Sequence, residues 1–260
     1  MPFNLIDTDC SPLFVDYEYE IADKSLLAER VGEMLLGHHY HILKIINTLT
    51  VSHPIHNNDA INATINQLKS ATVTKRDGWM FQMISWMALA TRNRGEKFYA
   101  NYPHFAPAQH GIDGLALILS SSDELASIII TEDKCTTQPR GKITSQVFPE
   151  FLVFEEGKKN NALIGIIASL ISNLNSGQIL EKVQNDIFNK DYRVYRIGIT
   201  REEIHNDKDG RNLLFLNYDK HVKGDAKRRN ASSIYIEDLR NWMEDLAEKV
   251  IIYLESKKTT

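Results

Sequence analysis

The stretch GIDGLALILSSSDELASIIITEDKCTT, residues 111 to 137, decides the fold class of this chain. Its two apolar runs, 111–119 and 126–135, have the composition of β-strands, and the SSSDE segment between them is typical of a turn. We therefore predict a β-hairpin. Charged residues stand within these runs, where a buried strand usually lacks them, and their placement needs an explanation.

Strand geometry lets three of these charged residues meet. Successive side chains of a strand point to opposite faces, so Glu132 and Lys134 share the apolar face of the second run, whereas Asp133 points the other way. Asp113 lies far from the turn on the first run, as Glu132 and Lys134 do on the second. If the runs pair about the turn, two carboxylates and one amine converge at the strand ends.

Such a group of residues is suited to a metal-dependent reaction. Two carboxylates at a partly desolvated strand end repel each other unless a cation lies between them, and their hard oxygen atoms favour Mg²⁺ or Mn²⁺. A lysine beside the ion can orient an attacking water or stabilise charge that develops on phosphorus. The pattern indicates hydrolysis of a phosphodiester. The simpler alternative is a structural ion pair between Glu132 and Lys134, and the additional carboxylate of Asp113 argues against it.

The remaining patterns predict an α/β protein with a change of character near residue 100. Apolar spacing predicts helices at 24–47, 58–68 and 79–91, so that residues 1–100 form a helical N-terminal region. Residues 101–260 then hold the hairpin and the rest of a mixed sheet flanked by helices. In this second part we expect helices at 145–156, 161–174, 177–188 and 236–254, and strands at 192–200 and 212–218.

Composition limits the class of protein. The chain has 260 residues, a net charge of −4 and two cysteines, Cys10 and Cys135, which are too few for a disulfide framework. Its N-terminus carries acidic residues where a signal peptide has basic ones, and its longest aliphatic run, 162–171, is too short to cross a bilayer. We expect a cytoplasmic protein without a membrane partner. The negative charge argues against general coating of nucleic acid but permits a local contact with DNA.

The spacing of Asp113, Glu132 and Lys134 resembles the D…(D/E)-x-K signature of the PD-(D/E)xK nucleases. The proline that often precedes the first Asp of that signature is absent, and Gly111-Ile112 stands in its place. The resemblance implies that Asp113 and Glu132 are ligands of Mg²⁺ or Mn²⁺, that the main-chain carbonyl of Asp133 is a further ligand, and that Lys134 is the catalytic lysine.

A wider resemblance involves one branch of that superfamily. The segment FAPAQHGIDGLA at 105–116, the ITEDK ending of the second run and the pattern of the first hundred residues resemble the nuclease subunits, HamA, of the Hachiman anti-phage defence system. This resemblance implies a bacterial DNase that works beside a large helicase, HamB, with residues 1–100 contacting the partner. The alternative is a non-catalytic subunit that keeps a nuclease fold in order to dock a helicase or DNA.

Several other residues have more than one interpretation. Glu33 is either a further acid of the site or a solvated helical residue, and the histidines of the HHYH segment at 38–41 are either zinc ligands or ordinary core and surface residues. Basic residues of 223–229, with Arg140 and Lys142, either line a path for phosphates or are solvated. Cys135 lacks a neighbouring base in the sequence, which disfavours a nucleophile. Helical spacing favours a core role for four further residues: Trp79, Phe81, Met83 and Trp86.

Overall fold

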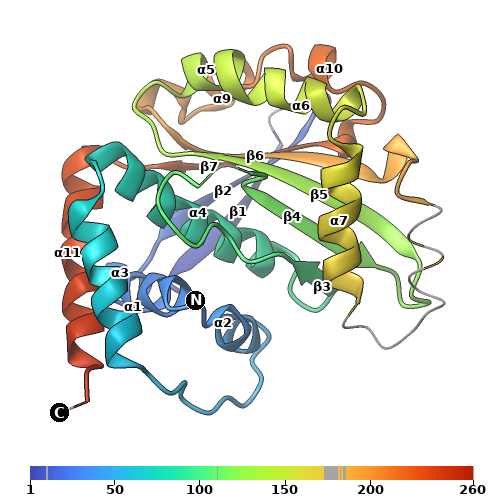
Figure 1. Cartoon of the computed structure of the whole chain (residues 1–260). Helices are drawn as coiled ribbons and strands as arrows, with labels where there is room; N and C mark the ends of the chain where they lie inside the picture. The colour runs from blue at the N-terminus through green and yellow to red at the C-terminus, as the bar shows by residue number, and fades with distance from the viewer. Residues whose placement is uncertain (10, 110, 173–180, 182, 184–185, 260) are drawn as a thin grey trace.

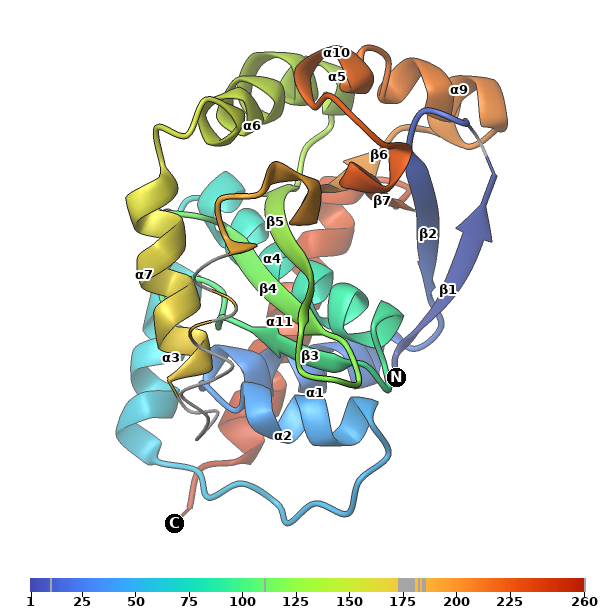
Figure 2. The ribbon, with the colours of Figure 1, turned by 90° about the vertical axis from the view of Figure 1, so that its right-hand side faces the viewer.

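The computed structural model describes the chain except for residues 10, 110, 173–180, 182, 184–185 and 260. Its centre is a seven-stranded sheet with the strand order β1-β2-β7-β6-β5-β4-β3. The strands are β1 (Phe3–Thr8), β2 (Val15–Ile21), β3 (Lys97–Ala100), β4 (Gly114–Leu119), β5 (Leu125–Lys134), β6 (Arg193–Arg201) and β7 (Arg229–Tyr235). Figure 2 shows the sheet twisting from β1 and β2 at one edge to β3 at the other.

The sheet is mixed. Strands β3, β4 and β5 are antiparallel neighbours, and the β4–β5 pair is the predicted hairpin. Strands β5, β6 and β7 run parallel, β2 is parallel to β7, and β1 is antiparallel to β2. Because parallel strands need crossover connections, helices link β5 to β6 and β6 to β7. The predicted mixed sheet flanked by helices is confirmed.

Helices cover both faces of the sheet (Figure 1). One face carries α1 (Lys24–Leu35), α2 (His39–Ile46), α3 (Asn58–Ser70), α4 (Val73–Arg92) and α11 (Leu239–Ser256). The other face carries α5 (Pro139–Lys142), α6 (Phe148–Glu155), α7 (Asn160–Ile171), α9 (Lys208–Leu214) and α10 (Tyr218–His221), with a π-helical turn at Ile143–Val147 before α6. Each face therefore has its own apolar core.

Side-chain alternation along β5 divides its residues between these layers. Ile128 and Ile130 are buried in the core beneath α6 and α7, whereas Ile129 packs with Leu89 of α4 on the opposite face. The apolar positions 79, 81, 83 and 86 of α4 are buried, which confirms their prediction as core residues. The same alternation at the end of β5 directs Glu132 and Lys134 to one face and the Asp133 side chain to the other.

The prediction that the first hundred residues are helical is wrong in part. They supply β1, β2 and β3 to the sheet, so a division of the chain at residue 100 does not coincide with a division of the sheet. The alternating sequence VDYEYEI of β2 buries Tyr17 and Tyr19 on one face, a strand pattern that the prediction overlooked. The long helix predicted at 24–47 is two helices, α1 and α2. Gly37 lies between them, and its left-handed backbone conformation (φ +86°), which glycine adopts readily, interrupts the helical path.

The prediction of a strand at 212–218 is also wrong, because this segment contains the end of α9 and the start of α10. Its buried residues Leu214, Phe215 and Tyr218 recur at helical spacing and face the second core. The strand β7 and the strand β3 were not predicted. The helix predicted at 161–174 corresponds to α7, and the one predicted at 177–188 lies mostly outside the described residues.

Gly198 of β6 lies against side chains from β5 and α4 next to the candidate site. A Cβ at this position would overlap with the carboxylate of Asp133 and the hydroxyl of Ser85, both of which are buried. We expect Gly198→Ala to lower the free energy of unfolding by about 1–3 kcal/mol, because a well-packed core resists added volume. Urea denaturation followed by circular dichroism measures this change.

The matched control is Gly165→Ala on the exposed face of α7, where an added Cβ meets nothing within 4 Å. This change should stabilise the chain by about 0.5–1 kcal/mol, because alanine is the better helix former. Equal stability of the two variants would contradict the packing described around Gly198.

Candidate functional site

Asp113, Glu132 and Lys134 converge at the ends of β4 and β5. Gly114 pairs with Thr131 in the antiparallel register, so Asp113, the residue just before β4, comes beside Glu132. The Lys134 ammonium donates to Glu132 Oε2 at 2.9 Å and to Asp113 Oδ2 at 3.1 Å. The predicted convergence of two carboxylates and one amine is confirmed, and the chemical roles of these residues stay predictions.

Asp133 has two different relations to this group. Its backbone N–H donates to Asp113 Oδ2 at 3.0 Å, which fixes Asp113 against β5. Its side chain lies on the opposite face of the strand, where its Oδ1 accepts from the Ser85 hydroxyl at 2.5 Å and lies 3.4 Å from Arg196 Nη1. The Asp133 carboxylate is therefore directed away from Glu132, and only main-chain atoms of Asp133 are available on the side of the site.

A cavity of about 430 Å³ opens over the three convergent side chains. Apart from Gly111, every residue that lines it carries a polar side chain: Gln109, Asp113, Glu132, Lys134, Gln146, Glu150 and Lys159. Lys159 pairs with Glu150 of α6. A cavity with this lining suits a hydrated, charged ligand rather than an apolar one.

Helix α4 contributes to the site from the opposite side of β4 and β5. Gln82 donates to Asp113 Oδ1 at 2.9 Å, and His104 Nδ1 lies 3.9 Å from the same oxygen. These contacts were not predicted. The signal for α4 lies in its sequence, because Gln82 and Ser85 are the polar residues that interrupt its apolar run WMFQMISWMALA at 79–90, and each contacts an acid of the site.

Burial shifts the pKa values of the site. Burial and the Asp113 charge raise the pKa of Glu132 to about 8, although the ammonium of Lys134 acts in the opposite direction. Burial alone would lower the pKa of Lys134, but the two adjacent carboxylates outweigh it and hold that pKa above its ordinary value. On the other face of β5, burial raises the pKa of Asp133 to about 6 against the opposing effect of Arg196.

The donor atoms present fit Mg²⁺ or Mn²⁺. Asp113 and Glu132 offer carboxylate oxygens beside a single amine, and the main chain of Asp133 offers a carbonyl oxygen. Burial and the nearby charge of Asp113 both raise the pKa of Glu132, so the two carboxylates repel each other in this position. A divalent cation bound between them would offset that repulsion.

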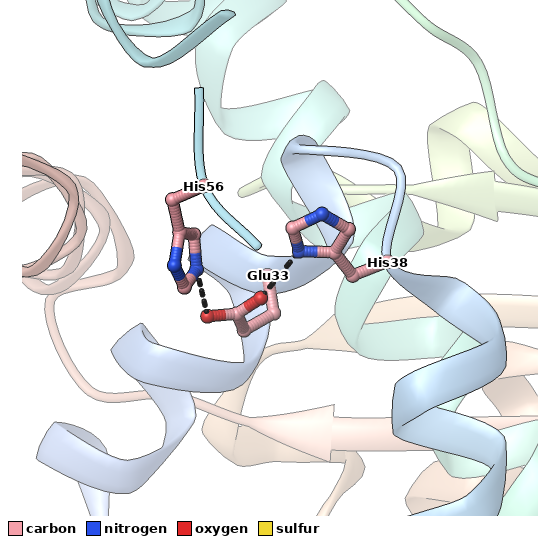
Figure 3. Close-up of side chains that lie close together, drawn as sticks. All are labelled: Glu33, His38 and His56. Atoms are coloured by element: carbon pink, nitrogen blue, oxygen red, sulfur yellow. Dashed lines mark hydrogen bonds and ion pairs between the residues drawn. The ribbon is translucent and has the colours of Figure 1, made fainter. Parts of the chain in front are cut away.

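Glu33 is not part of this arrangement. Its carboxylate contacts His38 and His56, which places it in a second cluster on α1 (Figure 3), and it lines a different cavity from that of Asp113. His38 is thus a partner of Glu33. The cluster of Glu33, His38 and His56 could not be foreseen from the HHYH segment alone, because His56 comes from the separate loop before α3.

The basic candidates have mainly structural contacts. Arg228 is buried and donates to Glu155, and Arg229 is buried and donates to main-chain carbonyls of Leu13 and Val222. A phosphate path through these two arginines is therefore wrong, whereas Lys223 and Lys227 of the same segment are exposed. Arg140 donates to the carbonyl of Leu214, and Lys142 is half-buried at the end of α5.

Cys135 follows β5 directly, and burial raises the pKa of its thiol to about 12. A thiol with so high a pKa is protonated at neutral pH and is a poor nucleophile. The expectation that Cys135 has no nucleophilic role stays consistent with its surroundings.

Comparisons of the chain with protein-family models, with curated proteins and with solved structures found no match. Among the described residues, none of the helices combines the length and apolar character needed to span a bilayer.

Glu132 sets a pH dependence for the stability of the metal-free chain. Its folded-state pKa of about 8 lies above its ordinary value of 4.5, so between these values the folded chain holds a proton that the unfolded chain releases. The contribution of Glu132 to the free energy of unfolding is complete below pH 4.5 and is lost as the pH rises through about 8. The free energy of unfolding should fall by at most about 1.4 kcal/mol per pH unit in this window.

Urea denaturation in the presence of EDTA, from about pH 5 to about pH 9, measures this slope. Glu132→Gln should flatten it, whereas Glu248→Gln on the exposed surface of α11 should leave it unchanged. Identical slopes for the parent chain and Glu132→Gln would show that Glu132 titrates normally.

Proposed function

We propose that this chain is a metal-dependent DNA nuclease that hydrolyses phosphodiester bonds. The observation that carries the proposal is the convergence of Asp113, Glu132 and Lys134 in one polar cavity at the ends of two paired strands. The same residues carry the resemblance to the PD-(D/E)xK nucleases, and the mixed sheet flanked by helices is compatible with that family. A purely structural ion pair needs one acid and one amine, whereas this site holds two acids.

The residues have separate roles in the proposed reaction. The carboxylates of Asp113 and Glu132 and the carbonyl of Asp133 would hold Mg²⁺ or Mn²⁺, which when bound polarises a phosphoryl oxygen and acidifies water. Gln82 and the Asp133 N–H hold Asp113 from two sides and so fix its orientation. Lys134 donates to both acids, and its proposed role is to stabilise the negative charge that develops on phosphorus.

The proposed setting is a bacterial anti-phage defence complex of the Hachiman type, in which the chain is the HamA-like nuclease subunit and a HamB-like helicase is its partner. The net charge of −4 supports a partner that delivers DNA, because a nuclease that receives DNA needs less general affinity for phosphates. Residues 1–100 are the proposed contact region.

Co-expression of the chain with a helicase encoded by a neighbouring gene should yield a stable complex. Separation of the two folded proteins on a size-exclusion column would count against this assignment.

The second candidate function is a non-catalytic subunit that docks a helicase or DNA. It is favoured by the pairing of Lys134 with both acids, because this pairing satisfies the charged groups without any ligand. The two candidates differ in what the chain does to a phosphodiester, so an activity assay separates them.

The direct test is nicking of supercoiled plasmid by the chain, alone and with its helicase. We expect nicking that needs Mg²⁺ or Mn²⁺, that EDTA abolishes, and that Asp113→Asn reduces by a factor on the order of 10² or more. Calorimetry with Mn²⁺ should show weaker binding to Asp113→Asn. Mn²⁺ binding by this variant as tight as that of the parent chain would show that Asp113 is not a metal ligand. If no nicking occurs with or without metal and with or without the helicase, the docking subunit would be favoured.

Replacement of Lys134 separates a catalytic lysine from a structural one. If Lys134 stabilises charge that appears only during the attack on phosphorus, Lys134→Ala should lower turnover by a factor on the order of 10² or more while DNA and Mn²⁺ still bind. Lys134→Arg should not restore activity, because a planar guanidinium does not replace a compact ammonium.

The control for this experiment is Lys97→Ala on β3, whose amine pairs with Asp123 at the hairpin turn, away from the cavity. Its turnover should equal that of the parent chain. A Lys134→Ala protein that melts far below the parent chain and yet cleaves DNA at the normal rate while folded would return Lys134 to the structural ion pair.

A further inference from the structure

A second cluster of metal-binding side chains lies on the α1 side of the molecule. It consists of Glu33 on α1, His38 just before α2, and His56 in the loop before α3. His38 Nδ1 lies 2.6 Å from Glu33 Oε2, and His56 Nε2 lies 2.9 Å from Glu33 Oε1. Figure 3 shows the two rings approaching the carboxylate from different sides, each with a nitrogen directed at one of its oxygens.

The cluster is enclosed rather than spread over the surface. The Glu33 side chain is 3% exposed, that of His56 13% and that of His38 23%. A buried carboxylate with two imidazoles is an expensive arrangement to keep in a fold unless its charge is compensated. Against the effect of burial, hydrogen bonds from Tyr253, His38 and His56, together with the charge of His56, lower the pKa of Glu33 and so favour its ionised form.

We propose that Glu33, His38 and His56 form a site for Zn²⁺ or a similar first-row transition metal. Two imidazole nitrogens and one carboxylate oxygen are ligand types that zinc takes, in contrast to the all-oxygen set around Asp113. The three ligand atoms already lie within 4.8 Å of one another. An ion bonded at about 2.0–2.2 Å to each of them needs ligand atoms roughly 3.4 Å apart in a tetrahedral site, so small side-chain rotations suffice.

Outer contacts hold the ligands as metal sites require. The hydroxyl of Tyr253 on α11 donates to Glu33 Oε1, an outer hydrogen bond of the kind that orients ligating carboxylates. Gly32 makes room for this tyrosine, since a Cβ at position 32 would lie 2.8 Å from Tyr253 Cδ1. The carboxylate is thus held from α11 while the histidines approach it from the loops around α2.

An adjoining cavity of about 370 Å³ gives the site an open position. Glu33 and His56 line it, together with His41 and His53, so that a water or a further imidazole can reach a bound ion. Arg30 also lines this cavity, but its guanidinium pairs with Glu29 at 2.5 Å, which compensates its charge. The site therefore has three protein ligands and a fourth position that faces the cavity.

A bound ion would connect three segments that are separate in the sequence. The chain between α2 and α3, residues 47–57, has no helix or strand of its own, and the His56–Glu33 contact ties it to α1. A metal bonded to Glu33, His38 and His56 would fasten this loop and the start of α2 to α1. The site is structural in character, and it does not rest on the proposed nuclease function.

The test is zinc binding by the full chain after metal removal. We expect one equivalent of zinc to remain after dialysis, a higher melting temperature on zinc addition, and visible absorption bands of a low-coordinate site with Co²⁺. Glu33→Gln and His56→Ala should each weaken zinc binding by about tenfold or more, since each removes a ligand. His221→Ala on α10 should bind zinc like the parent chain.

Should the ligand variants fail to fold, the parent chain supplies the decisive measurement. With ¹⁵N-labelled histidine, zinc should shift the resonances of His38 Nδ1 and His56 Nε2 and leave His221 unchanged. Retention of no zinc by the parent chain, equal zinc binding by the folded ligand variants, or resonance shifts confined to other histidines would each overturn the proposal.

Discussion

The pairing of Gly114 with Thr131 is the constraint on which the candidate site depends. This antiparallel register brings Asp113 beside Glu132, and the N–H of Asp133 then donates to Asp113. A shift by one residue would turn Glu132 and Lys134 to the opposite face, because side chains alternate along a strand. The register is held by the apolar residues of β4 and β5, which are buried in separate cores on the two faces of the sheet. Core packing and site geometry are therefore a single requirement.

The two faces of β5 end in different electrostatic arrangements. On one face, Lys134 lies between two acids and borders an open polar cavity. On the other face, the buried side chains of Arg196 and Asp133 lie 3.4 Å apart and share the Ser85 hydroxyl, and the Tyr17 hydroxyl accepts from Arg196 Nε. Loss of one member of such a buried pair typically costs about 3–5 kcal/mol, because the remaining charge is left uncompensated. The buried pair is a structural anchor, whereas the group on the other face borders a polar cavity.

The two candidate metal clusters differ in ligand chemistry and in surroundings. The oxygen ligands at Asp113 and Glu132 lie beside an amine in a polar cavity, as a hydrolytic centre needs. The cluster of Glu33, His38 and His56 mixes nitrogen and oxygen ligands and joins α1 to the segments on either side of α2. Imidazole nitrogen suits zinc and similar transition metals, whereas an all-oxygen set suits Mg²⁺ or Mn²⁺, so the two proposed sites would select different ions.

The sequence by itself determined the local features of the protein. Period-two alternation and the turn residues of 111–137 were sufficient to predict the hairpin and the convergence of Asp113, Glu132 and Lys134, because both depend on neighbours along one hairpin. Helical spacing was likewise sufficient for α4 and α11. The apolar run at 212–218 was misread as a strand, since a short apolar segment fits either period until its packing partners are known.

Only the tertiary structure decided which distant residues meet. Gln82 reaches Asp113 across 31 residues, Arg196 reaches Ser85 across 111, and Tyr253 reaches Glu33 across 220. The tertiary structure also placed β1 and β2 in the same sheet as the hairpin, and it buried Arg228 and Arg229. The physical reason is that these contacts depend on how helices and strands pack together in space, and a linear pattern of residue types carries little information about that packing.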